Sequence, residues 1–115
     1  MPIREMPSVD TQPSINLIRW TVVRFKTAEI QADFAYGWDT RNCCGRASSV
    51  ITSTDKNLPG LRTRTGRAYR LLGQPCGDLE GEHVFREKYS ELIALCEFSD
   101  VSVEYLTLAV PCSLA

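Results

Sequence analysis

The residues from Glu29 to Trp38 alternate between apolar and other side chains with a strict period of two. The apolar members are Ile30, Ala32, Phe34, Tyr36 and Trp38. A period of two places every second side chain on one face of an extended chain, so the segment predicts a β-strand with one buried and one wet face. The preceding residues 15–26, INLIRWTVVRFK, are β-branched and aromatic and predict a second strand. A short turn near Thr27 and Ala28 would join the two as an antiparallel hairpin.

Within residues 15–26 the alternation changes phase, because Trp20 and Val22 share one parity while Val23 and Phe25 share the other. This change predicts either a bulge near Val22 or burial of both faces of the strand. The aromatic side chains of the two strands are expected to form much of the core. They are Trp20, Phe25, Phe34, Tyr36 and Trp38.

Residues 61–73, LRTRTGRAYRLLG, predict a second hairpin whose register follows from its turn. A two-residue turn over 65–66 would set Arg64 opposite Arg67, and like charges across a ladder are unfavourable. A three-residue loop over 64–66, with Gly66 in the left-handed conformation, avoids this contact. In that register Thr63 pairs with Arg67 and Leu61 with Tyr69, the core face carries Leu61, Tyr69 and Leu71, and Arg62 and Arg70 point outward.

Three further elements are predicted by local patterns. Residues 47–54 favour a short strand, and residues 79–97 favour one long helix with Asp78 as its N-cap and His83 on its water face. The apolar stripe of this helix would be Phe85, Tyr89, Leu92, Ile93 and Cys96. Residues 100–110 favour a last strand whose apolar parity switches near Tyr105, which indicates a bulge or a second buried face at a subunit contact.

The chain has 115 residues, enough for one domain. Residues 1–14 contain three prolines and predict a flexible N-terminal arm, and residues 15–115 predict the domain. The element order is β-β-β-β-β-α-β, without the βαβ alternation of parallel sheets. It predicts an α+β fold, with a curved antiparallel sheet of five to six strands and one long helix packed on one face.

Composition excludes several classes of protein. No apolar run approaches a membrane span and no secretory signal is present, so we expect a cytoplasmic protein with no membrane partner. Five cysteines, an odd number, are expected to be free thiols. His83 is the only imidazole, and no spacing of cysteine and histidine fits a metal site. We therefore expect no metal and no cofactor, and we assign no catalytic residues. A function other than catalysis is favoured, with an enzyme of unrecognised chemistry as the alternative.

The formal net charge of −1 hides a segregation of charge along the chain. Residues 41–70 hold seven basic residues and one acidic residue, whereas residues 78–104 hold eight acidic residues and two basic ones. These segments carry formal charges of +6 and −6. They are expected to face one another or to be solvated separately. The alternative is that the basic segment binds an acidic partner.

The best binding candidates are the arginines around the second hairpin, because a guanidinium makes planar, bidentate contacts with carboxylate or phosphate. They are Arg62, Arg64, Arg67 and Arg70, with Arg46 on a neighbouring strand. No exposed aromatic residues are interleaved with them, so an acidic protein or another phosphate-bearing partner is favoured over nucleic acid. The leading hypothesis is therefore a homodimeric interaction or adaptor protein. The alternative is a small-molecule binding domain whose pocket lies between strand 29–38 and the helix, with Tyr36 and Trp38 at its mouth.

The stretch TRTGRAYRLLG, residues 63–73, preceded by SVITS at 49–53, resembles a pattern of small uncharacterised bacterial proteins. Some of these are carried on integron gene cassettes. The resemblance implies an α+β domain with a hairpin, encoded on mobile DNA. It carries no functional residues over to this chain.

The predicted turn at Gly66 can be tested by substitution. Gly66→Val should lower the free energy of unfolding by about 1–2 kcal/mol, because a β-branched residue is strained at positive φ. Chemical denaturation measures the change. An unaltered midpoint would contradict the three-residue loop.

Overall fold

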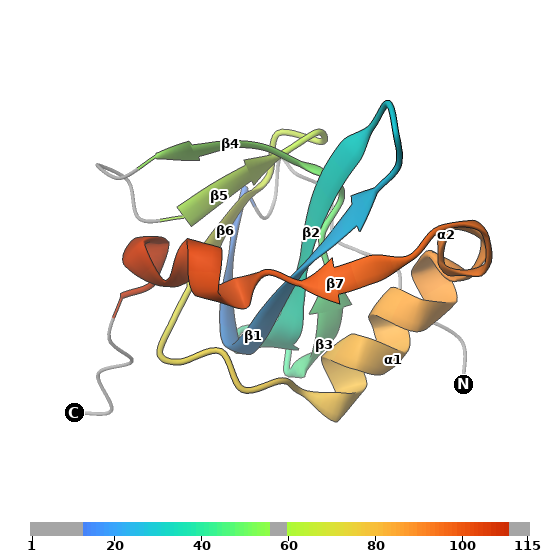
Figure 1. Ribbon diagram of the computed structural model, residues 1–115. Coiled ribbons are helices and arrows are strands. Elements are labelled where there is room, and N and C mark those ends of the chain that lie inside the picture. Colours follow the sequence, from blue (N-terminus) through green and yellow to red (C-terminus); the bar gives the residue numbers. More distant parts are fainter. Residues whose placement is uncertain (1–12, 56–59, 111–115) are drawn as a thin grey trace.

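The sheet of this protein is mixed, and its longest strand, near the centre, pairs with three other strands (Figure 1). The computed structural model describes residues 13–55 and 60–110. Its strands are β1 (Ser14–Lys26), β2 (Gln31–Asp39), β3 (Cys44–Ala47), β4 (Ile51–Asp55), β5 (Gly60–Thr63), β6 (Ala68–Leu71) and β7 (Phe98–Asp100). Its helices are α1 (Leu79–Lys88), α2 (Ser90–Leu95) and the 3-10 helix η1 (Ser102–Leu108). The fold class is α+β, as predicted.

The strand order is β3-β2-β1-β6-β5-β4, with β7 paired to β1. Most neighbours are antiparallel, but residues 14–17 of β1 pair with residues 68–71 of β6 in parallel. The predicted purely antiparallel sheet is therefore wrong. The reason is that residues 27–67, which contain β2 to β5, form a connection long enough to bring β6 alongside β1 in the same direction. β2 occupies one edge of β1, and β6 and β7 share the other edge along its length.

The predicted β1–β2 hairpin is confirmed, and its irregularity lies between Ile18 and Thr21 rather than at Val22. Arg19 adopts a φ of 47° there, which rotates the strand and changes its phase. Both Val22 and Val23 are buried beyond this point. The bulge and the burial of both faces, which the phase change offered as alternatives, thus occur together.

On the predicted wet face of residues 29–38, Glu29 and Gln31 are exposed, but the residues from Asp33 onwards are buried. Ala35 is fully buried and Asp33 is 9% exposed, whereas Ile30 at the hairpin tip is 65% exposed. The Asp33 carboxylate tolerates burial because Arg24 donates two hydrogen bonds to it, at 2.8 and 3.0 Å, and the Tyr105 hydroxyl donates a third at 2.5 Å. Burial alone would raise the pKa of Asp33, but the hydrogen bonds from Arg24 and Tyr105 hold it below its ordinary value.

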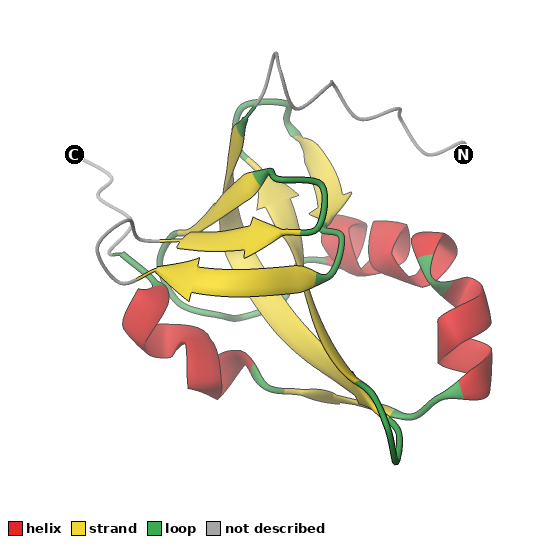
Figure 2. Cartoon of the chain, turned by 90° about the horizontal axis from the view of Figure 1, so that it is seen from above, coloured by secondary structure: helices red, strands yellow, loops and turns green. Residues whose placement is uncertain are grey.

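Two apolar cores lie on opposite sides of the β1–β2 ribbon, and Figure 2 shows α1 and α2 on one side and η1 on the other. The core beneath α1 contains Val23, Phe25, Phe34, Tyr36, Ala47 and Phe85. The core towards η1 contains Ile15, Leu17, Trp20, Val22, Ala35, Leu61, Tyr69, Leu71, Val101, Tyr105 and Leu108. The central ribbon is therefore covered on both faces.

The single helix predicted over 79–97 is wrong, because the helix breaks at Tyr89. Its N-cap is confirmed, since the Asp78 carboxylate accepts a hydrogen bond from the backbone N of Gly81. At the break, the Tyr89 hydroxyl donates to the carbonyl oxygen of Ser48 at 2.5 Å and its ring packs on Phe34. These tertiary contacts hold Tyr89 out of helical geometry and turn α2 away from α1.

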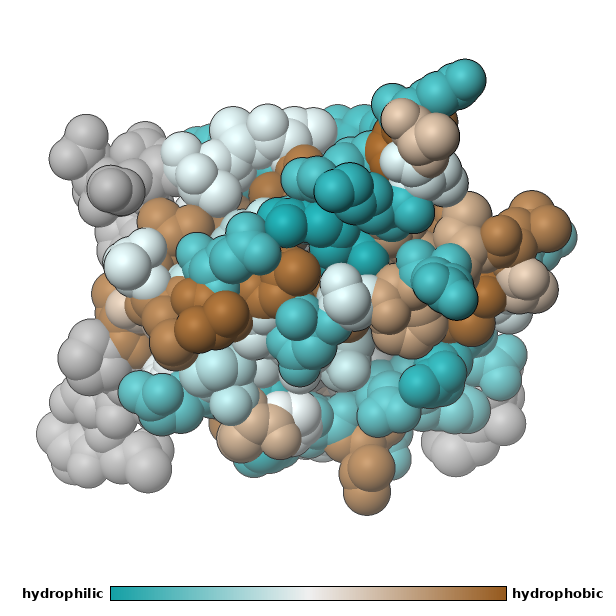
Figure 3. Space-filling view, in the orientation of Figure 1, coloured by the Kyte–Doolittle hydropathy of each residue, from teal (hydrophilic) through white to brown (hydrophobic). Residues whose placement is uncertain are grey.

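The strand predicted over 100–110 is also wrong, because residues 102–108 form η1. Three residues per turn bring Ser102, Tyr105 and Leu108 to one buried face, while Val103 stays 72% exposed. The apolar surface over η1 and over α2 is visible in Figure 3. The switch of parity therefore reflects a period of three, and a dimer of C-terminal strands loses its basis.

The remaining predictions divide between confirmed and corrected. The hairpin register is confirmed by the pairing of Leu61 with Tyr69 and by a φ of 88° at Gly66. The strand predicted over 47–54 is instead the end of β3 and the start of β4. Residues 1–12 of the predicted arm lie outside the described residues, and Ser14 already belongs to β1. Within the described ranges, no helix is long and apolar enough to cross a membrane.

Helix α1 packs on β2 at the backbone level, and Gly81 makes this possible. A Cβ atom at Gly81 would lie 2.7 Å from the backbone N of Gly37. In an exposed helix, glycine to alanine gains about 1 kcal/mol. Here Gly81→Ala should instead lower the free energy of unfolding by about 1–3 kcal/mol through overpacking.

Chemical denaturation measures this loss, and the exposed His83 provides the control. His83→Ala in the same helix should change stability by less than about 0.5 kcal/mol. A Gly81→Ala variant as stable as the wild type would contradict the close packing of α1 on β2.

Candidate functional site

The five arginines predicted as a binding cluster fall into two groups. Arg46 and Arg67 are buried, at 5% and 2% exposure. The exposed group is Arg62, Arg64 and Arg70. The structure therefore places three of the five candidates where a partner can reach them.

Arg46 belongs to a buried ion pair that closes the turn between β2 and β3. Its guanidinium donates to Asp39 from two nitrogens, at 3.0 and 3.1 Å, and Asp39 is fully buried. The same carboxylate accepts from the backbone N atoms of Arg41 and Asn42, at 3.0 and 3.1 Å. Asp39 is thus saturated with hydrogen bonds, and Arg46 has a structural role.

Arg67 follows the turn of the second hairpin, and its side chain is buried beside Tyr69. Its positive charge therefore lies beneath the protein surface. Above it, the Lys88 ammonium donates to the carbonyl oxygen of Ala47 at 3.3 Å. The pKa of Lys88 lies below its ordinary value, mainly because of burial and further because of repulsion from Arg46 and Arg67. The C-terminal end of α1 therefore lies over a region of positive charge.

The exposed arginines are held on a rigid hairpin. Arg62 lies opposite Ala68 on the outer face of β5 and β6, which Arg70 shares. Arg64 lies in the turn, where its backbone N donates to the carbonyl oxygen of Val50 at 2.9 Å. Burial raises the pKa of the Tyr89 hydroxyl to about 12, and the positive charge of Arg64 opposes that rise.

Among the residues that the structure describes, the two charged segments do not neutralise one another through ion pairs. Four arginines form ion pairs with carboxylates: Arg19 with Asp78, Arg24 with Asp33 and Glu104, Arg46 with Asp39, and Arg86 with Glu82. None of these pairs joins residues 41–70 to residues 78–104. With the side chains that the structure describes, those of residues 13–54 and 60–110, Arg62, Arg64 and Arg70 form no ion pair, although each is exposed. The hairpin therefore carries positive charge without a described carboxylate to balance it.

The two residues predicted at the mouth of a pocket between residues 29–38 and the helix both make close contacts within the chain. Tyr36 is only 9% exposed and stacks on Phe85 with ring centroids 5.1 Å apart. Trp38 is half-buried, and the guanidinium of Arg19 lies 5.7 Å from its ring centroid. The close backbone contact between Gly81 and Gly37 leaves no room for a ligand.

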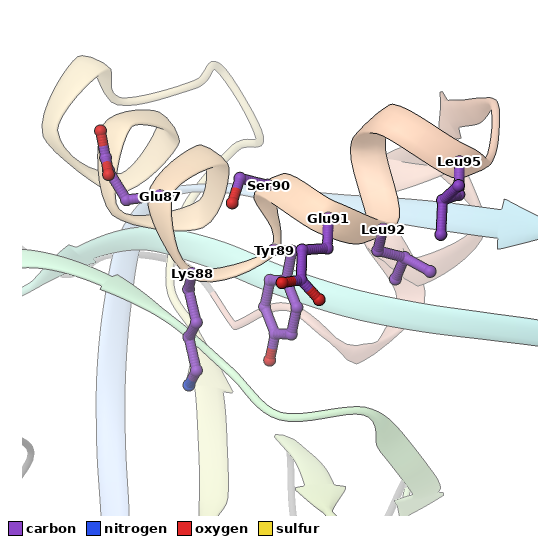
Figure 4. A pocket seen from close by; sticks show the side chains of 7 residues that line it. All are labelled: Glu87, Lys88, Tyr89, Ser90, Glu91, Leu92 and Leu95. Atoms are coloured by element: carbon purple, nitrogen blue, oxygen red, sulfur yellow. The ribbon is translucent and has the colours of Figure 1, made fainter.

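A different hollow lies at the junction of α1 and α2, with a volume of about 610 Å³ (Figure 4). Its lining residues are Glu87, Lys88, Tyr89, Ser90, Glu91, Leu92 and Leu95. The hollow exists because the helix breaks at Tyr89. The sequence offers no signal for it, because neither glycine nor proline interrupts residues 82–97. We call it the junction pocket.

Comparison with known proteins gives no counterpart: no protein-family model, curated protein or solved structure matches this chain.

The two groups of arginines should respond differently to truncation. Arg46→Ala should lower the free energy of unfolding by about 3–5 kcal/mol, because it leaves the Asp39 carboxylate buried without its charged partner. Arg70→Ala, at an exposed position, should change it by less than about 0.5 kcal/mol. Denaturant titration of both variants provides the measurement. Equal effects would contradict the division into structural and exposed arginines.

Proposed function

We propose that this protein is a small interaction protein that binds an acidic protein partner through the β5–β6 hairpin. The observation that supports this is the contrast among its arginines. Four are paired with carboxylates, whereas Arg62, Arg64 and Arg70 are exposed and have no ion pair with a described residue. Guanidinium groups of this kind are suited to bidentate contacts with the carboxylates of another molecule.

The hairpin backbone is fixed before any partner arrives. The backbone N of Gly66 donates to the carbonyl oxygen of Thr63 at 2.8 Å, and the Thr63 hydroxyl donates to that of Arg67 at 3.1 Å. Leu61 and Tyr69 anchor both strands in the core. Binding then has to order only the arginine side chains, which lowers the entropic cost of association.

An acidic protein suits this surface better than a nucleic acid. The large hydrophobic residues that are exposed in the described chain are all aliphatic, namely Ile30, Leu79, Leu95, Val103 and Leu106, so no aromatic platform for stacking bases accompanies the arginines. Short-range pairing with carboxylates remains the favoured mode.

Binding of a labelled poly-L-glutamate peptide, followed by fluorescence anisotropy, tests the proposal. Wild type should bind this peptide with an affinity that falls as salt is raised. The variant Arg62→Glu/Arg70→Glu should bind at least about tenfold more weakly, which corresponds to about 1.4 kcal/mol. A duplex DNA of equal charge should bind less tightly than the peptide.

The matched control is Lys26→Glu/Arg41→Glu, which changes net charge equally at exposed positions away from the hairpin. This variant should bind the peptide within about twofold of wild type, because charges beyond a Debye length are screened. Equal weakening in both variants would reject the hairpin as the binding surface. A preference for the DNA would reject an acidic protein as the partner.

A further inference from the structure

The junction pocket combines the carboxylates of Glu87 and Glu91 with two leucine side chains, of which Leu92 is partly buried and Leu95 is exposed. Glu91 and Leu92 lie beside one another below α2, and Leu95, farther along α2, is 83% exposed (Figure 4). Glu91 forms no ion pair with a described residue. Lys88 reaches towards the strands instead, where its ammonium donates to the carbonyl oxygen of Ala47.

An arginine side chain has the chemistry that this pocket requires. Its methylene groups can cover leucine side chains, while its guanidinium pairs with a carboxylate in a bidentate arrangement. The junction pocket therefore offers a carboxylate with apolar neighbours. The exposed arginines of the β5–β6 hairpin have no ion pair with such a group among the described residues.

The hairpin turn and the junction pocket lie near one another on the molecule. The backbone N of Arg64 donates to the carbonyl oxygen of Val50 at 2.9 Å, and two residues earlier the carbonyl oxygen of Ser48 accepts a hydrogen bond from the hydroxyl of Tyr89, which lines the pocket. A two-fold symmetric interface requires that a patch and its complement lie on the same face, so that each copy supplies both. Arg64 and the pocket meet that requirement.

Unpaired charges of the described residues are complementary between the two regions. The exposed acidic residues without an ion pair include Glu80, Glu87, Glu91 and Glu97, on and just after the two helices. The unpaired arginines of the hairpin carry the opposite sign. A net charge of −1 means that two copies repel one another only weakly.

We infer that the acidic partner is a second copy of this chain, and that Arg64 of each copy enters the junction pocket of the other and pairs with Glu91. This inference rests on the proposed function, because it uses the same hairpin. It assigns the pocket a ligand, the arginine side chain, and it completes each pocket with a residue of the other copy.

Light scattering combined with analytical ultracentrifugation tests the inference with charge-reversal variants. Wild type at micromolar concentration should have twice the 12.9 kDa mass of the chain. Arg64→Glu and Glu91→Arg should each raise the dimer dissociation constant at least about tenfold. Mixing the two variants should restore a dimer. In the mixed dimer, one of the two contacts is the native Arg64–Glu91 pair, and the other is formed by the two substituted positions, whose charges are both reversed and still attract.

Controls separate pairing from general effects of charge and folding. Lys26→Glu and Glu29→Arg reverse charges near the tip of the β1–β2 hairpin and should leave dimerisation unchanged. Circular dichroism should show the same helix signal for all variants. Poly-L-glutamate should dissociate the wild-type dimer, because it competes for the hairpin.

The outcomes distinguish the inference from the proposed function. A monomeric wild type that still binds poly-L-glutamate overturns self-association and leaves the hairpin as a binding surface for another acidic protein. A wild-type dimer that persists in both charge-reversal variants overturns the Arg64–Glu91 contact. A monomer that also fails to bind the peptide overturns both proposals.

Discussion

The burial of the β1–β2 ribbon on both faces is the constraint on which the rest of the structure depends. A two-stranded ribbon cannot be stable alone, so each face requires its own cover. On one face α1 approaches until Gly81 meets the backbone of Gly37, and on the other face Tyr105 ties η1 to the buried carboxylate of Asp33. Polar groups inside the ribbon are tolerated because Arg24 and Tyr105 satisfy them. The β5–β6 hairpin, the α1–α2 region and η1 are thus all arranged around the β1–β2 ribbon.

Local patterns predicted those elements whose geometry is determined by near neighbours in the sequence. The two hairpins, the register of Leu61 with Tyr69 and the Asp78 cap follow from periodicity and turn chemistry. Errors arose where a distant contact decides the structure. The helix breaks because Tyr89 bonds to Ser48, which lies 41 residues away. The apolar residues after Asp100 fit a period of two or three about equally well, and the contact of Tyr105 with Asp33 favours the 3-10 helix.

The candidate site was predicted only in part, for the same reason. The register of β5 and β6 indicated that Arg62 and Arg70 point outward, and they do. The burial of Arg46 depends on the Asp39 carboxylate across a turn, and Arg67 is buried beside Tyr69, which belongs to the core towards η1. Opposite charge blocks along the chain predicted either mutual contact or separate solvation, and the ion pairs of the described residues do not join the two blocks. The sequence shows that basic and acidic residues nearly balance, but only the structure shows which of the described ones have no ion pair within the chain.

The pairing of both β6 and β7 with one edge of β1 affects how the protein folds. Its first residues pair with residues 68–71, and residues 23–25 pair with residues 98–100. Contacts between segments so far apart in the chain close large loops before they gain energy, which slows folding. During synthesis, the β1–β2 hairpin leaves the ribosome well before either partner strand. Its open edge therefore stays available to other chains until β7 has been made, and this interval is when the nascent protein is most prone to aggregate.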